Sequence, residues 1–355
     1  MQEGPGKTNK VLQSLRGRIV SAKLPAGARL PTRKELEERF HAGPHTIQRA
    51  LDLLKAQGFV EARGTRGTFV VEYPPHLYEY AVAFPYGVRH DDAGAARFWS
   101  ALRSEAAFSE QWTPKRLVIL DNINGTENDS LRDLTARVSD GRIAGVIFVA
   151  VPEGVAGGPL IRKPSVPTVA VWDAPADVRI PTVRLDLKAF MSKALAYLAE
   201  HGRKRIAVIG VSPEDKRSFY GDVMRMAARR KLRTEPYWIH LMHPDDGDCA
   251  QSCTHLLMRA PRAERPDGLI ITDDNLVPFA TSGLEAAGAR GGVDADVVAH
   301  ANFPWATDTV TPVARLGFDA REVLRVCVDA IDRQRHGRTA ARRTQISPRW
   351  EHEVK

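Results

Sequence analysis

The sequence predicts a two-lobed α/β body, with two parallel sheets and flanking helices, preceded by a small winged helix-turn-helix domain. Three observations support this prediction. The first 75 residues contain three amphipathic helical segments and a glycine-rich hairpin. After residue 78, seven apolar, strand-like runs alternate with helical stretches, which is the pattern of parallel sheets with crossover helices. A length of 355 residues leaves room for two or three domains and excludes a single small domain.

The first two helical segments are recognised by periodicity and by a capping motif. One helix is expected over residues 10–23, where three apolar side chains share one face: Leu12, Leu15 and Ile19. A second helix should start at Thr32, because Glu35 follows three residues later and completes a capping box. This helix should end near His41.

A third helix and a hairpin complete the N-terminal domain. The helix should begin at Pro44, a residue suited to a first helical turn, and end at Gly58. Four apolar residues mark its buried face: Ile47, Ala50, Leu51 and Leu54. Two short strands, 59–62 and 68–71, are expected on either side of residues 63–67, whose glycines and arginines form a cationic hairpin tip. This order of elements is typical of a winged helix-turn-helix domain.

Positive charge is concentrated in this N-terminal segment. Residues 1–75 contain 13 Lys and Arg against 7 Asp and Glu, so they carry +6 of the net charge of +8. A compact basic segment attached to a nearly neutral body indicates a polyanionic partner, because contacts of Lys and Arg with phosphate dominate nucleic-acid affinity. A solvated basic face without such a partner would give the same count, so charge alone leaves both interpretations open.

Residues 10–71 resemble the DNA-binding domain of the GntR family. That family has the strings L-P-S-x-R-x-L, S-R-x-T-V-R-x-A-L-x-x-L and G-T-F-V, and the matching segments here are 30–36, 46–54 and 67–70. The chain departs from the family where Gly43 and Pro44 replace Ser-Arg and where Gln48 replaces an Arg. The resemblance implies a winged helix-turn-helix fold that binds double-stranded operator DNA. The departures affect the contacts that such a domain usually makes with DNA bases, and they do not affect the predicted fold.

Seven polar residues of this domain are candidates for DNA contact: Arg33, Lys34, His45, Thr46, Gln48, Arg49 and Arg66. Those of the third helix are expected off its apolar face, where they can reach a major groove, in which Gln and Arg form bidentate bonds with adenine and guanine. Arg33, at a helix start, and Arg66, at the hairpin tip, are better placed for phosphates or the minor groove. The alternative for each residue is an ordinary surface charge.

Two prolines separate this domain from the body. Pro74 and Pro75 break regular structure, so we expect a linker at 74–77 between a DNA-binding domain at 1–73 and a body at 78–355. The seven strand-like runs of the body are 80–84, 116–120, 145–151, 168–171, 205–209, 268–271 and 297–300. Seven strands over this length fit two sheets better than one, so the body should have two lobes.

The body resembles the periplasmic-binding-protein-like effector domain of the LacI/GalR repressors over residues 78–352. The matching segments are 182–186 (V-x-x-D-N), 201–210 (G-H-R-R-I-A-F-I-G), 266–273 (P-D-A-V-x-x-x-N-D), 296–303 (D-I-S-V-V-G-F-D-D) and the terminal strand at 346–349. The chain departs at Thr272, where Asn is usual, and at Ala301 and Asn302, where two Asp are usual. The resemblance implies a small-molecule effector and a homodimer assembled through the body, which fixes the spacing of two half-sites.

In a two-lobed sensor the ligand lies at the carboxyl ends of the strands, where loops converge. Six candidate ligand residues follow predicted strands: Tyr86, Arg89, Asp121, Trp172, Asp273 and Asp274. Carboxylates and Arg can bond hydroxyl groups and aromatic rings can stack on a sugar, so a sugar-like effector is expected. Asp273 ranks first because it matches the ligand-binding acid of the family. Its alternative role is a helix N-cap before Asn275.

The sequence predicts no metal, cofactor or catalytic site. His240, Cys249, Cys253 and His255 crowd one acidic segment, but their spacing matches no closed zinc pattern, and a polar loop entering a helix explains them more simply. The sequence contains no nucleophile elbow, phosphate loop or dinucleotide-binding fingerprint. Three cysteines, a polar N-terminus and no long apolar run indicate a cytoplasmic protein without a membrane partner.

These observations favour a transcription regulator whose affinity for operator DNA is controlled by a small-molecule effector. Two alternatives stay open. The body could belong to a binding protein or an enzyme, since fold does not imply function, although such a protein has no use for the N-terminal segment. The sensor could also have lost its ligand, given the departures at Thr272 and Ala301.

Overall fold

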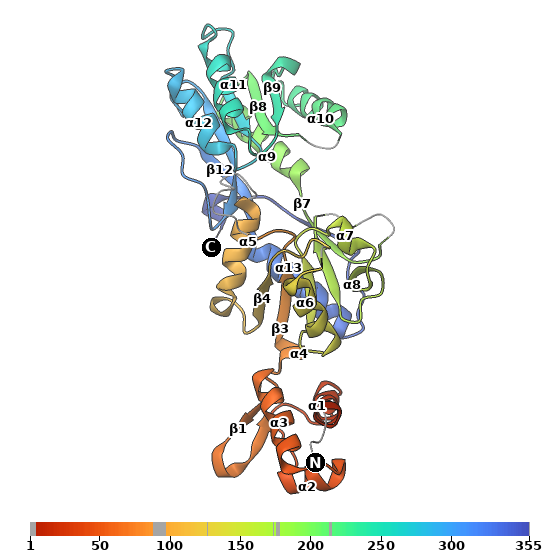
Figure 1. The fold of residues 1–355 in the computed structure, drawn as a ribbon. Helices are drawn as coiled ribbons and strands as arrows, with labels where there is room; N and C mark the ends of the chain where they lie inside the picture. The colour runs from red at the N-terminus through yellow and green to blue at the C-terminus, as the bar shows by residue number, and fades with distance from the viewer. Residues whose placement is uncertain are drawn as a thin grey trace. The chain divides into compact units, whose positions relative to one another are not determined.

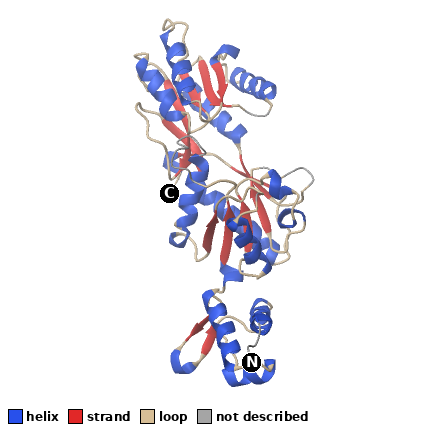
Figure 2. Ribbon diagram, viewed as in Figure 1, coloured by secondary structure: helices blue, strands red, loops and turns tan. Residues whose placement is uncertain are grey.

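The computed structural model describes residues 5–87, 97–125, 127–172, 174, 178–212 and 215–354. Its strands form a two-stranded hairpin and two six-stranded sheets, with helices around them (Figures 1 and 2). The predicted fold class is thereby confirmed. The chain divides into two compact units, Met1–Tyr86 with Ala106–Pro181 and Cys327–Arg342, and Gly87–Glu105 with Thr182–Val326 and Arg343–Lys355. Among the described residues, no helix has the length and apolar character needed to cross a membrane.

The N-terminal domain has the predicted helices and wing. Its elements are α1 (Pro5–Val20), α2 (Arg33–Phe40), α3 (Pro44–Ala56) and the antiparallel strands β1 (Val60–Ala62) and β2 (Thr68–Val70). The predicted capping box is present, with the Thr32 N–H donating to the Glu35 carboxylate at 2.7 Å. The first helix is the least accurate prediction, since α1 starts and ends earlier than the expected 10–23.

One hydrophobic core holds this domain together. Every helix and the wing region contribute fully buried side chains to it, among them Leu15, Leu36, Ile47, Leu54 and Phe59. Burial of each such side chain contributes about 1.5–3 kcal/mol relative to leaving it exposed. The elements of the domain therefore depend on packing against one another.

The wing tip requires glycine. It is a 3-10 turn, Gly64–Arg66, that is closed by Gly67. Gly64 has a φ of +61° and Gly67 a φ of +106°, backbone conformations that favour glycine. A Cβ atom at Gly67 would also lie 3.0 Å from Nε of Arg29. The two glycines thus permit the tight turn that carries Arg66.

The first six-stranded sheet has the strand order β13-β7-β6-β5-β3-β4. Its strands are β3 (Glu79–Ala83), β4 (Arg116–Leu120), β5 (Gly145–Phe148), β6 (Thr168–Val171), β7 (Thr182–Leu185) and β13 (Arg343–Ile346). Helix α4 (Pro75–Tyr78) precedes β3. The helices between β3 and β6 are α5 (Arg97–Ala107), α6 (Asp129–Ser139), α7 (Glu153–Ala156) and α8 (Pro159–Arg162). The pairs β3–β4, β3–β5, β5–β6 and β7–β13 are parallel, so the carboxyl ends of paired strands lie at one edge.

The second six-stranded sheet has the order β14-β12-β11-β10-β8-β9. Its strands are β8 (Ile206–Val211), β9 (Ile239–Met242), β10 (Gly268–Ile271), β11 (Asp296–Phe303), β12 (Ala314–Asp319) and β14 (Arg349–Trp350). The helices of this part of the chain are α9 (Leu187–Glu200), α10 (Lys216–Ala228), α11 (Gly247–Arg259), α12 (Val277–Ala286) and α13 (Ala320–Arg335). All seven predicted strands of the body are present in the two sheets, whereas β9 and β12 were not predicted.

Strand register brings two polar segments together in the second sheet. Strand β10 lies between β8 and β11, and Gly268 is opposite Ile206 on one side and Asp296 on the other. Because β10 and β11 are parallel and β11 is longer, the residues that follow β10 lie beside the last residues of β11. This arrangement brings the polar residues at the ends of the two strands together.

A half-buried histidine lies where the chain passes from the wing to the first strand of the body. His76 of α4 stacks on Phe59, with ring centroids 5.9 Å apart. Its Nδ1 atom has no hydrogen-bond partner among the described residues. Burial, together with the nearby Arg335 guanidinium, lowers the pKa of His76 to about 4. The imidazole is therefore neutral in the folded protein at pH 7.

We expect His76 to make the protein sensitive to acid. Its pKa of about 4 in the folded state is below the ordinary value of 6.5. The unfolded chain therefore binds a proton more readily, and stability is lost as the pH falls from 6.5 towards 4. His76→Phe keeps a ring against Phe59 but removes this titration, so thermal denaturation should show a smaller drop in Tm from pH 7 to pH 5 than in the parent. An equal drop would contradict the prediction.

Candidate nucleic-acid interface and ligand site

Helix α3 has a buried apolar face and exposed polar residues. Four apolar residues are buried, as the periodicity predicts: Ile47, Ala50, Leu51 and Leu54. His45 and Arg49, four residues apart and therefore on one side of the helix, are exposed. Gly43 is the N-cap of α3, and Pro44 occupies the first turn, where its missing N–H costs no helical hydrogen bond. His45 and Arg49 are thus accessible to a groove of DNA.

Two other candidates on α3 have different surroundings. The expectation that Thr46 lies off the buried face is wrong, because only 7% of its surface is exposed. Thr46 precedes Ala50 by four residues, which places both on the face that packs into the core. The Gln48 side chain is partly buried, and its amide Nε2 donates to Oδ1 of Asp52 at 2.7 Å. A base contact by Gln48 would require exchange of this hydrogen bond.

Three further cations lie on other elements of the domain. Arg33 and Lys34 are in the first turn of α2 and Arg66 is on the wing, and all three side chains are exposed. Within the part of the chain that the structure describes, neither these three residues nor Arg49 forms an ion pair. Their charges are therefore not neutralised by the protein and can be used for phosphates.

In the second unit, polar side chains gather at the carboxyl ends of β10 and β11. Asp274, which follows β10, is 2% exposed. Its Oδ2 atom accepts a hydrogen bond of 2.7 Å from Nδ2 of Asn302, and its Oδ1 atom lies 3.7 Å from Nδ1 of His300. Both partners are on β11. A carboxylate with so little contact with water is tolerated only where such polar neighbours replace the lost hydration.

This cluster contains polar atoms that the protein leaves without partners. Among the described residues, neither Nδ1 of His300 nor Oδ1 of Asn302 has a hydrogen-bond partner, although both atoms are buried. Buried polar atoms are normally bonded, and the exceptions mark strain, an ordered water or a ligand. An imidazole nitrogen, an amide oxygen and a carboxylate are together suited to hydroxyl groups, which both donate and accept.

Asp273, ranked first from the sequence, has a local role. Its Oδ1 atom accepts hydrogen bonds from the backbone N–H of Asn275 at 2.9 Å and from Nδ2 of Asn275 at 2.8 Å. These bonds stabilise the turn before α12, a role close to the capping alternative. Burial raises the pKa of Asp273. Counted from Pro266, the last residue of P-D-A-V-x-x-x-N-D falls on Asp274, so the family's acid corresponds to Asp274, and the departure lies at Asp273 rather than at Thr272.

Three predicted ligand residues belong to the first unit. Tyr86 lies just beyond β3, Asp121 follows β4 and Trp172 follows β6, each on the carboxyl side of its strand. Trp172 has a φ of +70°, a left-handed conformation that costs a bulky residue on the order of 1–3 kcal/mol. Such residues cluster at functional sites, so Trp172 stays a candidate. Arg89 lies outside the described residues.

His300 and Asn302 were not among the predicted ligand residues. They lie two positions apart in β11, so their side chains are on the same face of the sheet. Both are buried in a strand that is otherwise mostly apolar. A pair of polar residues at positions i and i+2 of a buried strand is the sequence signal that identifies them.

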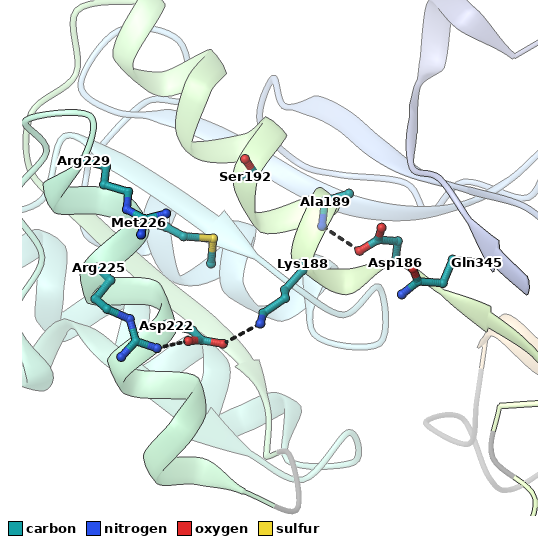
Figure 3. A pocket seen from close by; sticks show the side chains of 9 residues that line it. All are labelled: Asp186, Lys188, Ala189, Ser192, Asp222, Arg225, Met226, Arg229 and Gln345. Carbon is teal, nitrogen blue, oxygen red and sulfur yellow. Dashed lines mark hydrogen bonds and ion pairs between the residues drawn. The ribbon is translucent and has the colours of Figure 1, made fainter. Parts of the chain in front are cut away.

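A groove of about 610 Å³ lies between α9 and α10 of the second unit (Figure 3). Asp222 lies between Lys188 and Arg225 and pairs with both. Asp186 is also satisfied, because it accepts a hydrogen bond from the Ala189 backbone N–H. None of the predicted site residues lines this groove. Since its charged groups largely neutralise one another, we assign no ligand to it.

Comparison with known protein families agrees with this architecture. Residues 7–70 match the family described as bacterial regulatory proteins, gntR family. Residues 195–352 match the periplasmic binding protein-like domain. Both resemblances inferred from the sequence are therefore confirmed. The first match covers the winged domain, and the second covers the part of the chain that contains Asp274, His300 and Asn302.

Individual proteins resemble the two parts separately. The HTH-type transcriptional regulator Rv0792c of Mycobacterium tuberculosis is 32% identical over 65 residues, which are 18% of this chain and 24% of that protein. The chain thus matches about a quarter of this relative's length. Among solved structures, a LacI family transcriptional regulator from Arthrobacter sp. FB24 in complex with lactose has a TM-score of 0.57 at 16% identity, and the match covers 77% of this chain and 97% of that one.

A second solved structure gives the same result. A LacI family transcriptional regulator from Lactobacillus casei, with bound glucose, has a TM-score of 0.52 at 15% identity, covering 77% of this chain and 98% of that one. Likeness at these identities shows a shared fold.

Proposed function

We propose that this chain, which joins a domain of the gntR family of bacterial regulatory proteins to a periplasmic-binding-protein-like domain, is a transcription regulator controlled by a small-molecule effector. The observation that carries the proposal is the presence of two unlike sites in one chain. One is a set of exposed cations on the winged domain, and the other is a buried polar cluster with unpartnered atoms. Families of regulatory and binding proteins, rather than enzymes, match the chain. We place the protein in the cytoplasm, where it meets DNA.

DNA recognition is proposed to rest on α3. Its apolar face is buried in the domain core, so its opposite face is the one that can enter a major groove. Arg49 is exposed there and can form bidentate bonds with guanine, while His45 lies one turn earlier. Arg66 of the wing and the cations of α2 would neutralise phosphates and set the position of the domain on the duplex.

Substitutions should separate base contacts from phosphate contacts. Arg49→Ala should cost ~1–3 kcal/mol of operator binding and reduce the preference for operator over random DNA. Arg66→Ala should weaken binding to both DNAs by a similar factor, because phosphates carry no sequence information. Gln48→Ala should act in the same direction as Arg49→Ala but with a smaller loss, because a base contact by Gln48 must first replace its hydrogen bond to Asp52. Fluorescence anisotropy at several salt concentrations, with an operator selected from a random pool, measures these effects. Equal losses on both DNAs for Arg49→Ala would remove the base-reading assignment.

The effector is proposed to bind the cluster of Asp274, His300 and Asn302 through hydroxyl groups. The carboxylate and the two unpartnered atoms of this cluster support a sugar-like ligand. The presence of lactose and glucose in solved structures with the same fold supports the same class. The assignments of Tyr86, Asp121 and Trp172 stay predictions from the sequence.

Asp274→Asn and Asp273→Asn form a matched pair for testing this site. Charge-assisted hydrogen bonds contribute roughly 1.5–3 kcal/mol each, so Asp274→Asn should weaken effector binding by about one to three decades. Asp273→Asn should have a smaller effect, because its oxygen is already used by Asn275. Calorimetry with the best hit from a thermal-shift screen of sugars, polyols and nucleosides measures both. Equal losses would contradict the choice of Asp274, and a screen without any hit would favour a sensor that has lost its ligand.

The regulator is further proposed to act as a homodimer through residues 78–352. One winged domain per chain reads one half-site, so two chains are needed for a palindromic operator. Sedimentation velocity of the full chain at micromolar concentration should give a dimer, and the isolated winged domain should bind the same operator more weakly. A monomer both with and without operator would contradict this proposal.

A further inference from the structure

Two cysteines of the second unit face each other on one helix. Cys249 and Cys253 are four residues apart in α11, with 3.9 Å between their Sγ atoms. Cys249 is exposed, whereas Cys253 is partly buried against the hydrophobic core of this unit. The remaining cysteine, Cys327, is fully buried in α13. The protein therefore has one accessible dithiol and one shielded thiol.

A disulfide fits this pair poorly. The Sγ–Sγ distance of 3.9 Å exceeds the bond length of about 2.05 Å. Cβ atoms four residues apart on a helix are also about 5–6 Å from each other, whereas a disulfide needs about 3.5–4.5 Å. Closing the bond would require distortion of α11. A single bound atom that bridges the two sulfurs, in contrast, can be held without distortion of α11.

We propose that Cys249 and Cys253 form a binding site for one soft, thiophilic centre, either trivalent arsenic or a soft metal ion such as Cu(I). With a bond of about 2.3 Å to each sulfur, typical of metal–thiolate bonds, the separation of 3.9 Å corresponds to an angle of roughly 115° at the bound centre. Thiolates select soft centres of this kind over hard cations. Rotation of the exposed Cys249 side chain allows this angle to adjust.

The number of ligands distinguishes this site from a zinc site. Structural zinc takes four protein ligands. Across the described ranges, no group of three or more His, Cys, Asp and Glu side chains is placed to hold a metal ion. The class of ligand that fits is therefore a centre that two thiolates satisfy, or one that carries its own third substituent, as an organoarsenical does.

Binding exchanges protons without oxidation. Burial, together with the hydrogen bond between the two thiols, raises the pKa of Cys253 to about 11, so this thiol is protonated at neutral pH. With phenylarsine oxide, two As–S bonds form, the arsenic–oxygen bond breaks, and the two thiol protons leave with the oxygen as water. Arsenic stays trivalent. With a metal ion, the two protons are released to solvent.

The experiment uses the full-length, reduced protein with phenylarsine oxide, and the adducts are read by native mass spectrometry. We expect one bridging adduct per chain that resists excess 2-mercaptoethanol and is removed by 2,3-dimercaptopropanol. Cys249→Ser and Cys253→Ser should each lose the resistant adduct. A parallel titration with Cu(I), buffered by a competing chelator, compares the two ligand classes. The class that binds more tightly should prevent the other from binding to the same two thiols.

A matched control retains two cysteines on α11. Gln251→Cys combined with Cys253→Ser places the thiols two residues apart, where side chains do not face each other, so no resistant adduct should form. Unchanged circular dichroism and Tm verify that each variant is folded. A resistant adduct in this control or in a single Ser variant would overturn the proposal. The same conclusion would follow if the parent bound neither phenylarsine oxide nor Cu(I).

Discussion

The buried carboxylate of Asp274 is the group around which the proposed sensor is organised. Only 2% of its surface is exposed, so its charge depends on polar partners rather than on water. Those partners come from β11, because the parallel register of β10 and β11 brings the end of one strand beside the other. Among the described residues, Nδ1 of His300 and Oδ1 of Asn302 have no hydrogen-bond partner, and these are the atoms that we propose for a ligand. A register that stabilises the sheet thus also assembles the proposed site.

The winged domain divides its side chains between folding and function. Its core takes one face of α3, and this leaves Arg49 and His45 exposed on the same helix. Phe59 belongs to this core and also stacks on His76, so the packing that stabilises the domain continues into the segment leading to β3. Because such a small core has few residues, each buried contact is a large share of the stability of the domain.

The second unit contains two proposed sites of different chemistry that border one helix. Helix α12 begins just after the turn formed by Asp273 and Asn275, and it packs closely on α11, which carries the dithiol. A Cβ atom at Gly283 of α12 would lie 2.2 Å from the backbone oxygen of Gln251, so the two helices approach too closely for any other residue there. Oxygen and nitrogen groups are suited to hydroxyls at one site, and sulfur is suited to soft centres at the other.

The sequence by itself determined the local features of this protein. The capping box at Thr32, the glycines of the wing, the apolar face of α3 and the seven apolar strands all follow from short-range patterns, and two sets of motifs identified the families that the two parts resemble. Only the tertiary structure decided that β9 and β12 complete the second sheet and that His300 and Asn302 lie beside Asp274. These features depend on neighbours far away in the chain, because burial and pairing are set by strand register and helix packing rather than by adjacent residues.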